Sequence, residues 1–169
     1  DGPLTSRLQH IHVGDTLEVG DKPVGTLTLA NLELGGNLWM LATGTGIAPF
    51  ISLLRDHTTY DHFDCIHVVW SVRQQQELLA YHSFLQDCDI SYTPVVTQDL
   101  EWPGMNKRIT NMISAGLVLP ECDPINNKVM ICGSMPFNND VKQMLEQWGW
   151  QEGTRRAAGT FVQEKAFVQ

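Results

Sequence analysis

The sequence predicts an α/β fold: a doubly wound, parallel, five-stranded sheet with helices on both faces, preceded by a partial antiparallel β-barrel. Three observations lead to this expectation. From residue 37 onward, apolar runs alternate with segments of helical periodicity. A glycine-rich turn joins the first apolar run to the first helix. The residues before this region contain short strand-like runs with no long helix between them.

Five apolar runs predict the strands of the sheet. The first, Leu38 to Ala42, is continuously apolar, as expected of a strand buried on both faces. We expect strands over 38–42, 65–70, 91–97, 128–132 and 160–167. Helical periodicity predicts helices over 47–55, 74–85, 109–115 and 138–148. Ligands of such sheets bind at the carboxyl ends of the strands.

The N-terminal region predicts a different architecture. Residues 15–19 and 25–29 are expected to form two antiparallel strands, with glycine and proline between them. Two strands cannot bury their common face alone. We therefore expect residues 1–36 to be the C-terminal remnant of a truncated β-barrel, and residues 37–169 to form a nucleotide-binding α/β domain.

Composition excludes several functional classes. A net charge of −8 argues against nucleic-acid binding, which needs a basic face. No run approaches the roughly 20 apolar residues of a membrane span. The four cysteines are scattered, without the spacing of metal ligands. We therefore expect no metal site, and reduced thiols in a cytoplasmic protein.

The strongest local motif follows the first strand and reads Thr43-Gly44-Thr45-Gly46-Ile47-Ala48-Pro49. Its glycines allow a tight turn and a close approach of backbone N–H groups to a diphosphate. A plain glycine-rich turn is the alternative, but the position between a buried strand and a helix favours dinucleotide binding. We expect a bulky residue at Gly46 to abolish binding and to leave the fold intact.

The end of the second strand indicates the type of dinucleotide. NAD-binding sheets place an acidic residue there to bind the ribose 2′-hydroxyl. This chain has Ser71 and Arg73 instead, and no acidic residue before Glu77. A hydroxyl and a guanidinium suit the 2′-phosphate of NADP. Lys107 and Arg108 are either a second cationic contact or a solvated pair on a loop.

Two further segments give weaker signals. Thr5 can cap a short helix, and together with Ser6 it forms a candidate anion site. Cys132-Gly133-Ser134 ends the fourth strand. A buried structural thiol is the default interpretation of Cys132, although its place at the carboxyl edge is compatible with a nicotinamide contact.

Taken together, these segments resemble the bacterial type of ferredoxin/flavodoxin–NADP⁺ reductase. The resemblance covers essentially the whole chain in the right order, through residues 2–8, 25–27, 38–49, 72–73, 130–134 and 164–168. It implies an enzyme with FAD and NADP(H) as cofactors. Such an enzyme passes a hydride between NADPH and FAD, and single electrons to or from ferredoxin or flavodoxin.

The resemblance also implies positions for the cofactors. By analogy, Thr5 and Ser6 lie near the FAD pyrophosphate, and residues 1–36 belong to the FAD-binding barrel. Thr45 and Gly46 lie at the nicotinamide side of NADP, and Arg73 and Arg108 near its 2′-phosphate. The junction where the hydride transfers is formed by Cys132, Ala166 and Phe167. No residue is expected to act as a catalytic acid or base, because the two cofactors carry the chemistry.

This sequence departs from the family pattern at two places. The flavin-holding motif Arg-x-Tyr-Ser occurs nowhere in these residues, so we expect this chain alone to hold FAD weakly. Gln98 follows the third strand where the family tends to have an arginine, which affects the preference for NADP over NAD. The alternatives are an NADP-binding module without redox activity and a related oxygenase or cytochrome reductase component. We expect a monomer.

Overall fold

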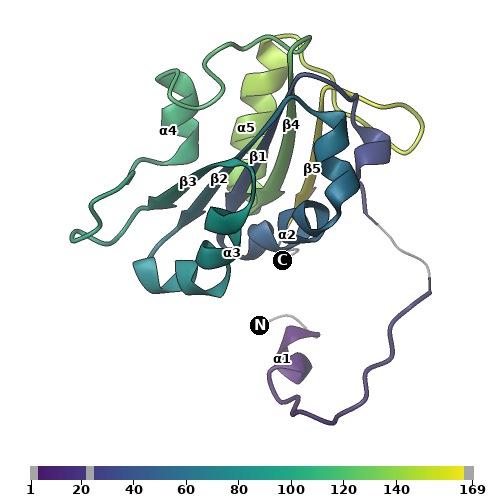
Figure 1. The fold of residues 1–169 in the computed structure, drawn as a ribbon, viewed down its shortest axis with the longest axis vertical. Coiled ribbons are helices and arrows are strands. Elements are labelled where there is room, and N and C mark those ends of the chain that lie inside the picture. The colour runs from purple at the N-terminus through teal and green to yellow at the C-terminus, as the bar shows by residue number, and fades with distance from the viewer. Residues whose placement is uncertain (1–3, 22–24, 166–169) are drawn as a thin grey trace.

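The computed structural model describes residues 4–21 and 25–165. Its centre is a single sheet of five parallel strands in the order β3-β2-β1-β4-β5 (Figure 1). The strands are β1 (Asn37–Thr43), β2 (Cys65–Val72), β3 (Ser91–Val96), β4 (Asn127–Gly133) and β5 (Phe161–Lys165). From β1, the chain adds β2 and β3 on one side of the sheet and then β4 and β5 on the other. The point between β1 and β4 where the chain changes sides creates a ligand-binding crevice at the carboxyl edge of the sheet.

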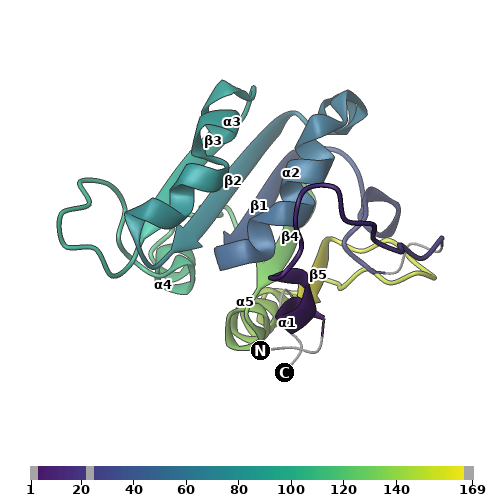
Figure 2. The same cartoon turned by 90° about the horizontal axis from the view of Figure 1, so that it is seen from below.

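Helices cover both faces of the sheet (Figure 2). One face carries α2 (Ile47–Arg55), η4 (Gln75–Ala80) and α3 (His82–Asp87), with the short helix η3 (His57–His62) after α2. The opposite face carries α4 (Ile109–Ser114) and α5 (Met135–Gln147). The predicted doubly wound sheet is therefore confirmed. None of the helices in the described ranges is long and apolar enough to cross a lipid bilayer.

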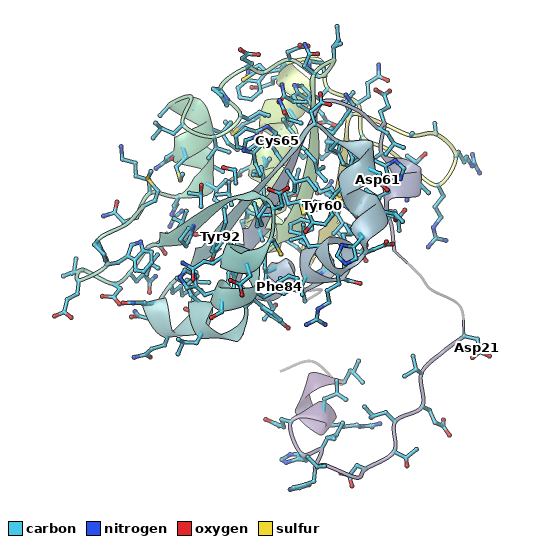
Figure 3. All side chains as sticks on the ribbon, viewed as in Figure 1. Asp21, Tyr60, Asp61, Cys65, Phe84 and Tyr92 are labelled. Carbon is cyan, nitrogen blue, oxygen red and sulfur yellow. The ribbon has the colours of Figure 1, made fainter. Side chains whose placement is uncertain are left out.

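The alternation of side chains along each strand divides the core into two clusters. In β1, Leu38 and Met40 face the α2 side, whereas Trp39 and Leu41 face the α4 and α5 side. All four are nearly or completely buried. Tyr60, Phe84 and Tyr92 line the outer part of the α2 side, where they pack against the buried cluster (Figure 3).

Two helices differ from their predicted bounds. The helix expected over 74–85 is split into η4 and α3 at Tyr81, whose φ of −139° is outside the helical range. Helix α5 begins three residues before the predicted start at residue 138, because Ser134 caps it and Pro136 is tolerated in its first turn.

The two antiparallel strands expected in the N-terminal region are wrong in the described residues. Residues 15–19 are exposed and have no neighbouring strand to pair with, and residues 25–29 lead into the short helix η1 (Leu29–Asn31). The short helix α1 (Thr5–Leu8) and the segment after it extend away from the sheet, and Asp21 lies far out along this segment (Figure 3). The β-barrel is therefore not part of the observed architecture.

Residues 25–33 attach instead to β5 and to the loop just before it. The backbone N–H groups of Thr26 and Leu27 both donate to Glu164 Oε2, at 2.9 and 3.3 Å. Further along, the Glu33 N–H donates to the Gly159 carbonyl at 2.8 Å. The Glu164 carboxylate thus accepts the backbone hydrogen bonds of residues 26–27 that we expected a neighbouring strand to accept.

Candidate functional site: a cavity at the carboxyl edge

A cavity of about 570 Å³ opens at the carboxyl edge of the sheet. Residues from the ends of β1 and β2, from the loop after β3 and from the starts of α4 and α5 line it. They are Thr43, Gly44, Thr45, Ser71, Val72, Arg73, Glu77, Thr97, Gln98, Arg108, Ile109, Thr110, Ser134, Pro136, Phe137 and Asp140. Its volume lies within the range of roughly 300–1,000 Å³ that is typical of small-molecule sites.

The turn after β1 forms an open cradle on the cavity wall. Gly44 has a φ of +53°, and a Cβ atom built there would meet nothing within 4 Å. The Gly44 carbonyl accepts a hydrogen bond from Trp70 Nε1 at 2.8 Å, which fixes the turn to β2. Thr43 Oγ1 accepts from the Ser134 N–H at 3.2 Å and so links the ends of β1 and β4. The turn is held rigidly, and its outer side is free for a ligand.

Gly46 has a different role from Gly44. A Cβ atom there would lie 2.1 Å from the Cys132 carbonyl oxygen, so the backbone of β4 occupies the space that a side chain needs. The expectation that a bulky residue at Gly46 leaves the fold intact is therefore wrong. Gly133 is restricted in the same way, because its Cβ would lie 2.1 Å from Thr43 Oγ1.

The end of β2 forms the cationic corner of the cavity. Arg73 and Arg108 both line it and are exposed, and within the described residues neither guanidinium forms an ion pair. The loop after β3 is joined to this corner because the Gln98 N–H donates to the Arg73 carbonyl at 2.9 Å. The cavity therefore combines two arginines and the glycine cradle, and the acidic residues Glu77 and Asp140 also line it.

The first turn of α5 closes the cavity on the side of β4. Ser134 is the N-cap, and its Oγ accepts from the Phe137 N–H at 3.5 Å. Pro136, Phe137 and Asp140 line the cavity beside it. The end of β1 thus faces the beginning of a 13-residue helix across the cavity.

Cys132 lies at the end of β4 beneath this region and is 2% exposed. Burial, together with the smaller effect of the neighbouring negative charge of Glu164, raises the pKa of its thiol to about 11. The thiol is therefore neutral at physiological pH, which makes it an apolar part of the core. The default interpretation of Cys132 as a buried thiol agrees with this environment.

The remaining predicted site residues lie elsewhere. Ile47, Ala48 and Pro49 form the start of α2, and Lys107 precedes Arg108; none of these four residues lines the cavity. Thr5 and Ser6 lie in α1. Ala166 and Phe167 lie outside the described residues.

Sequence reasoning missed several cavity residues. Glu77, Thr97 and Thr110 contribute polar groups, and Pro136, Phe137 and Asp140 come from the start of α5. The capping signal of Ser134 followed by Pro136 could have placed the start of this helix at the cavity. In the part of the chain that the structure describes, no three acidic, histidine or cysteine side chains form a group that could hold a metal ion.

The parallel sheet, its glycine cradle and the cavity with two arginines define a dinucleotide-binding domain of an oxidoreductase. Residues 40–143 match the family model of the oxidoreductase NAD-binding domain. The chain is 39% identical to ferredoxin–NADP reductase A of Sorangium cellulosum, over 99% of this chain and 66% of that protein. It is 40% identical to flavodoxin/ferredoxin–NADP reductase of Rhodobacter capsulatus, over 99% of this chain and 68% of that protein.

The chain belongs to the ferredoxin/flavodoxin–NADP⁺ reductase family. A solved structure of a ferredoxin–NADP⁺ reductase from Neisseria gonorrhoeae has the same fold, with a TM-score of 0.86 at 27% identity. The match covers 99% of this chain and 71% of that one, and that structure contains bound FAD and NADP. The chain thus spans about two thirds of the length of these relatives. Both relatives and structure favour the reductase over the alternative classes.

Proposed function

We propose that this chain binds NADP(H) in the cavity and belongs to an enzyme that transfers a hydride between NADPH and FAD. Such an enzyme exchanges single electrons with ferredoxin or flavodoxin, the partners named for its relatives. The observation that carries the proposal is the combination, in one cavity, of an open glycine cradle with two arginines that form no ion pair with any described residue. Family membership supports FAD and NADP(H) as the cofactors.

The cradle suits the diphosphate of the dinucleotide. The absence of atoms over Gly44 lets a phosphate approach the backbone directly, and the Thr45 hydroxyl is exposed beside it. Ser71 is at the end of β2, on the path from the cradle to the cationic corner. We place the diphosphate against residues 43–45.

The cationic corner suits the 2′-phosphate. Arginine keeps its charge at every physiological pH and offers paired donors to a phosphate group. Arg73 directly follows β2 and Arg108 directly precedes α4, so the two arginines approach the cavity from different segments and can contact two sides of one phosphate. Lys107 lines no part of the cavity, and we therefore assign it no direct contact.

FAD, when bound, supplies the step between two-electron and one-electron chemistry. The residues of this chain contribute orientation and exclusion of water. The Cys132 thiol is buried and neutral, and no carboxylate is needed as an acid or base. We keep the division into residues 1–36 and residues 37–169 as a proposal, with Thr5 and Ser6 near the FAD pyrophosphate.

The variant Arg73→Ala tests the assignment of the cationic corner. We expect it to weaken NADPH binding by about 1.5–3 kcal/mol, or roughly 10- to 150-fold, through loss of a charge-assisted contact. NADH binding should change much less, because NADH has no 2′-phosphate. Titration of both dinucleotides measures the difference.

Arg156→Ala is the matched control, because Arg156 is exposed in the loop before β5 and lines no part of the cavity. It should leave both affinities unchanged. Equal losses for NADPH and NADH in Arg73→Ala would contradict the 2′-phosphate assignment. In the full-length protein, anaerobic NADPH should bleach the flavin absorbance; binding without bleaching would instead indicate a nucleotide-binding module without redox activity.

A further inference from the structure

An acidic side chain lies in the cationic corner of the cavity. Glu77 is in the first turn of η4, four residues after Arg73, and its carboxylate lines the same cavity. Glu77 Oε1 accepts hydrogen bonds from the Arg73 N–H at 3.0 Å and the Gln74 N–H at 2.7 Å. The chain therefore folds back at the end of β2 and brings a negative charge to the arginine that faces the cavity.

These hydrogen bonds use only one oxygen of the carboxylate. Among the residues that the structure describes, Glu77 Oε2 makes no hydrogen bond, and Glu77 forms no ion pair with Arg73 or Arg108. Oε2 is thus an available acceptor at the end of the second strand. A carboxylate at the end of this strand is the group that binds the ribose 2′-hydroxyl in NAD-binding sheets.

The start of the adjoining loop lines the cavity with two uncharged side chains, Thr97 and Gln98. Gln98 lines the cavity, its N–H donates to the Arg73 carbonyl, and its own carbonyl accepts from Gln74 Nε2 at 3.4 Å. The amide of Gln98 can donate to a phosphate or exchange hydrogen bonds with a hydroxyl. At this corner, two cationic side chains are therefore opposed by one anionic side chain.

From this arrangement we infer that Glu77 sets the cofactor preference, so that the corner accepts both a 2′-phosphorylated and an unphosphorylated adenosine ribose. The inference rests on the proposed function. Arg73 and Arg108 attract the 2′-phosphate, and the Glu77 carboxylate repels it. The same carboxylate accepts a hydrogen bond from a free 2′-hydroxyl. Glu77 is a specificity-determining residue, and it also positions the backbone of Arg73.

The test uses Glu77→Gln in the full-length flavoprotein. Glutamine keeps an oxygen that can accept from the Arg73 and Gln74 N–H groups, but it removes the charge. The probes are 2′-phospho-AMP and AMP, titrated by calorimetry, because they differ only in the group at issue. We expect the ratio of their affinities to rise about two- to fivefold in favour of 2′-phospho-AMP, the size of effect expected for an exposed charge. In the wild type, NAD⁺ should displace bound NADP⁺ at high concentration.

Salt dependence separates the charge from the structural role. The rise in the ratio should shrink as ionic strength increases, because exposed charges are screened. A purely structural effect would change both affinities together at every salt concentration. Glu77→Ala removes the hydrogen bonds to the Arg73 loop as well, and it should weaken the binding of 2′-phospho-AMP. Glu33→Gln is the control, since it removes the same charge from an exposed residue before β1, at the opposite edge of the sheet.

Three results would overturn the inference. They are an unchanged ratio in Glu77→Gln, an equal rise in Glu33→Gln, and a failure of NAD⁺ to displace NADP⁺ from the wild type. Each leaves the proposed function standing as long as NADP⁺ binds. If NADP⁺ does not bind the wild-type flavoprotein at all, the proposed function and this inference are overturned together.

Discussion

At the scale of single residues, the two glycines of the turn after β1 are required for different structural reasons. Gly44 needs a left-handed backbone and faces open space, whereas Gly46 is pressed against the carbonyl of Cys132. Sequence reasoning found the motif but assigned both glycines to ligand binding. The difference arises from β4, which lies more than 80 residues further along the chain, and no local pattern reports it.

Gly44→Ala and Gly46→Ala should therefore separate binding from folding. The first puts a side chain at a φ of +53°, which costs about 1–2 kcal/mol, and places a methyl group where the diphosphate is proposed to lie. The second forces β4 to move, so it should lower the melting temperature more. Thermal unfolding and NADPH titration measure the two effects. A Gly46→Ala protein that melts with the wild type would contradict this assignment.

The position of the Glu77 carboxylate could not be predicted from the local sequence either. Sequence reasoning noted that no acidic residue precedes it, and concluded that the end of the second strand is cationic. The structure shows that η4 turns back, so a residue four positions later returns to the end of β2. The arginines were predictable from their position after a strand, but the carboxylate beside them depends on a helix cap.

At the scale of elements, the apolar runs predicted all five strands to within two residues at every boundary. Such runs are buried on both faces, and this gives a strong signal. The N-terminal segments were harder to predict, because alternating residues fit a strand only where a neighbouring strand exists. The structure pairs residues 26–27 with the side chain of Glu164, a contact between positions separated by 137 and 138 residues.

The attachment of residues 25–33 to β5 should depend on this carboxylate. Glu164→Ala removes the acceptor of the Thr26 and Leu27 N–H groups, so the free energy of unfolding should fall by about 1–3 kcal/mol. Hydrogen exchange should accelerate first at these two amides. Glu164→Gln keeps an acceptor oxygen and should lose less. Unchanged protection of both amides in Glu164→Ala would show that other contacts hold the segment.

At the scale of the whole molecule, the α/β domain is compact and the N-terminal segment is not. Residues 4–21 run outward from the sheet (Figure 1), and Val13, Leu17 and Val19 are largely exposed. The strand order of the domain could be predicted because connections between parallel strands are right-handed. No such rule predicts the path of residues 4–21.

A polypeptide of residues 1–169, expressed separately, should keep its α/β fold and lose FAD during gel filtration. Its N-terminal residues offer the flavin little buried surface, and each Å² of apolar surface left in water forfeits about 25 cal/mol. The ratio of flavin absorbance to protein absorbance in the eluted peak measures retention, with the full-length flavoprotein as the control. Stoichiometric FAD on the separate polypeptide would contradict the prediction.

The central place of β1 in the sheet has a consequence for how the chain folds. β1 pairs on one side with β2, 28 residues further along the chain, and on the other with β4, at a separation of 90 residues. During synthesis, β2 leaves the ribosome soon after β1, whereas β4 leaves it much later. The nascent sheet of β1, β2 and β3 therefore has an unpaired apolar edge until β4 emerges. Such an edge is a template for misassembly, and pairing over a long sequence separation is slow. Chaperone demand should therefore be greatest while the chain between β3 and β4 is being synthesised.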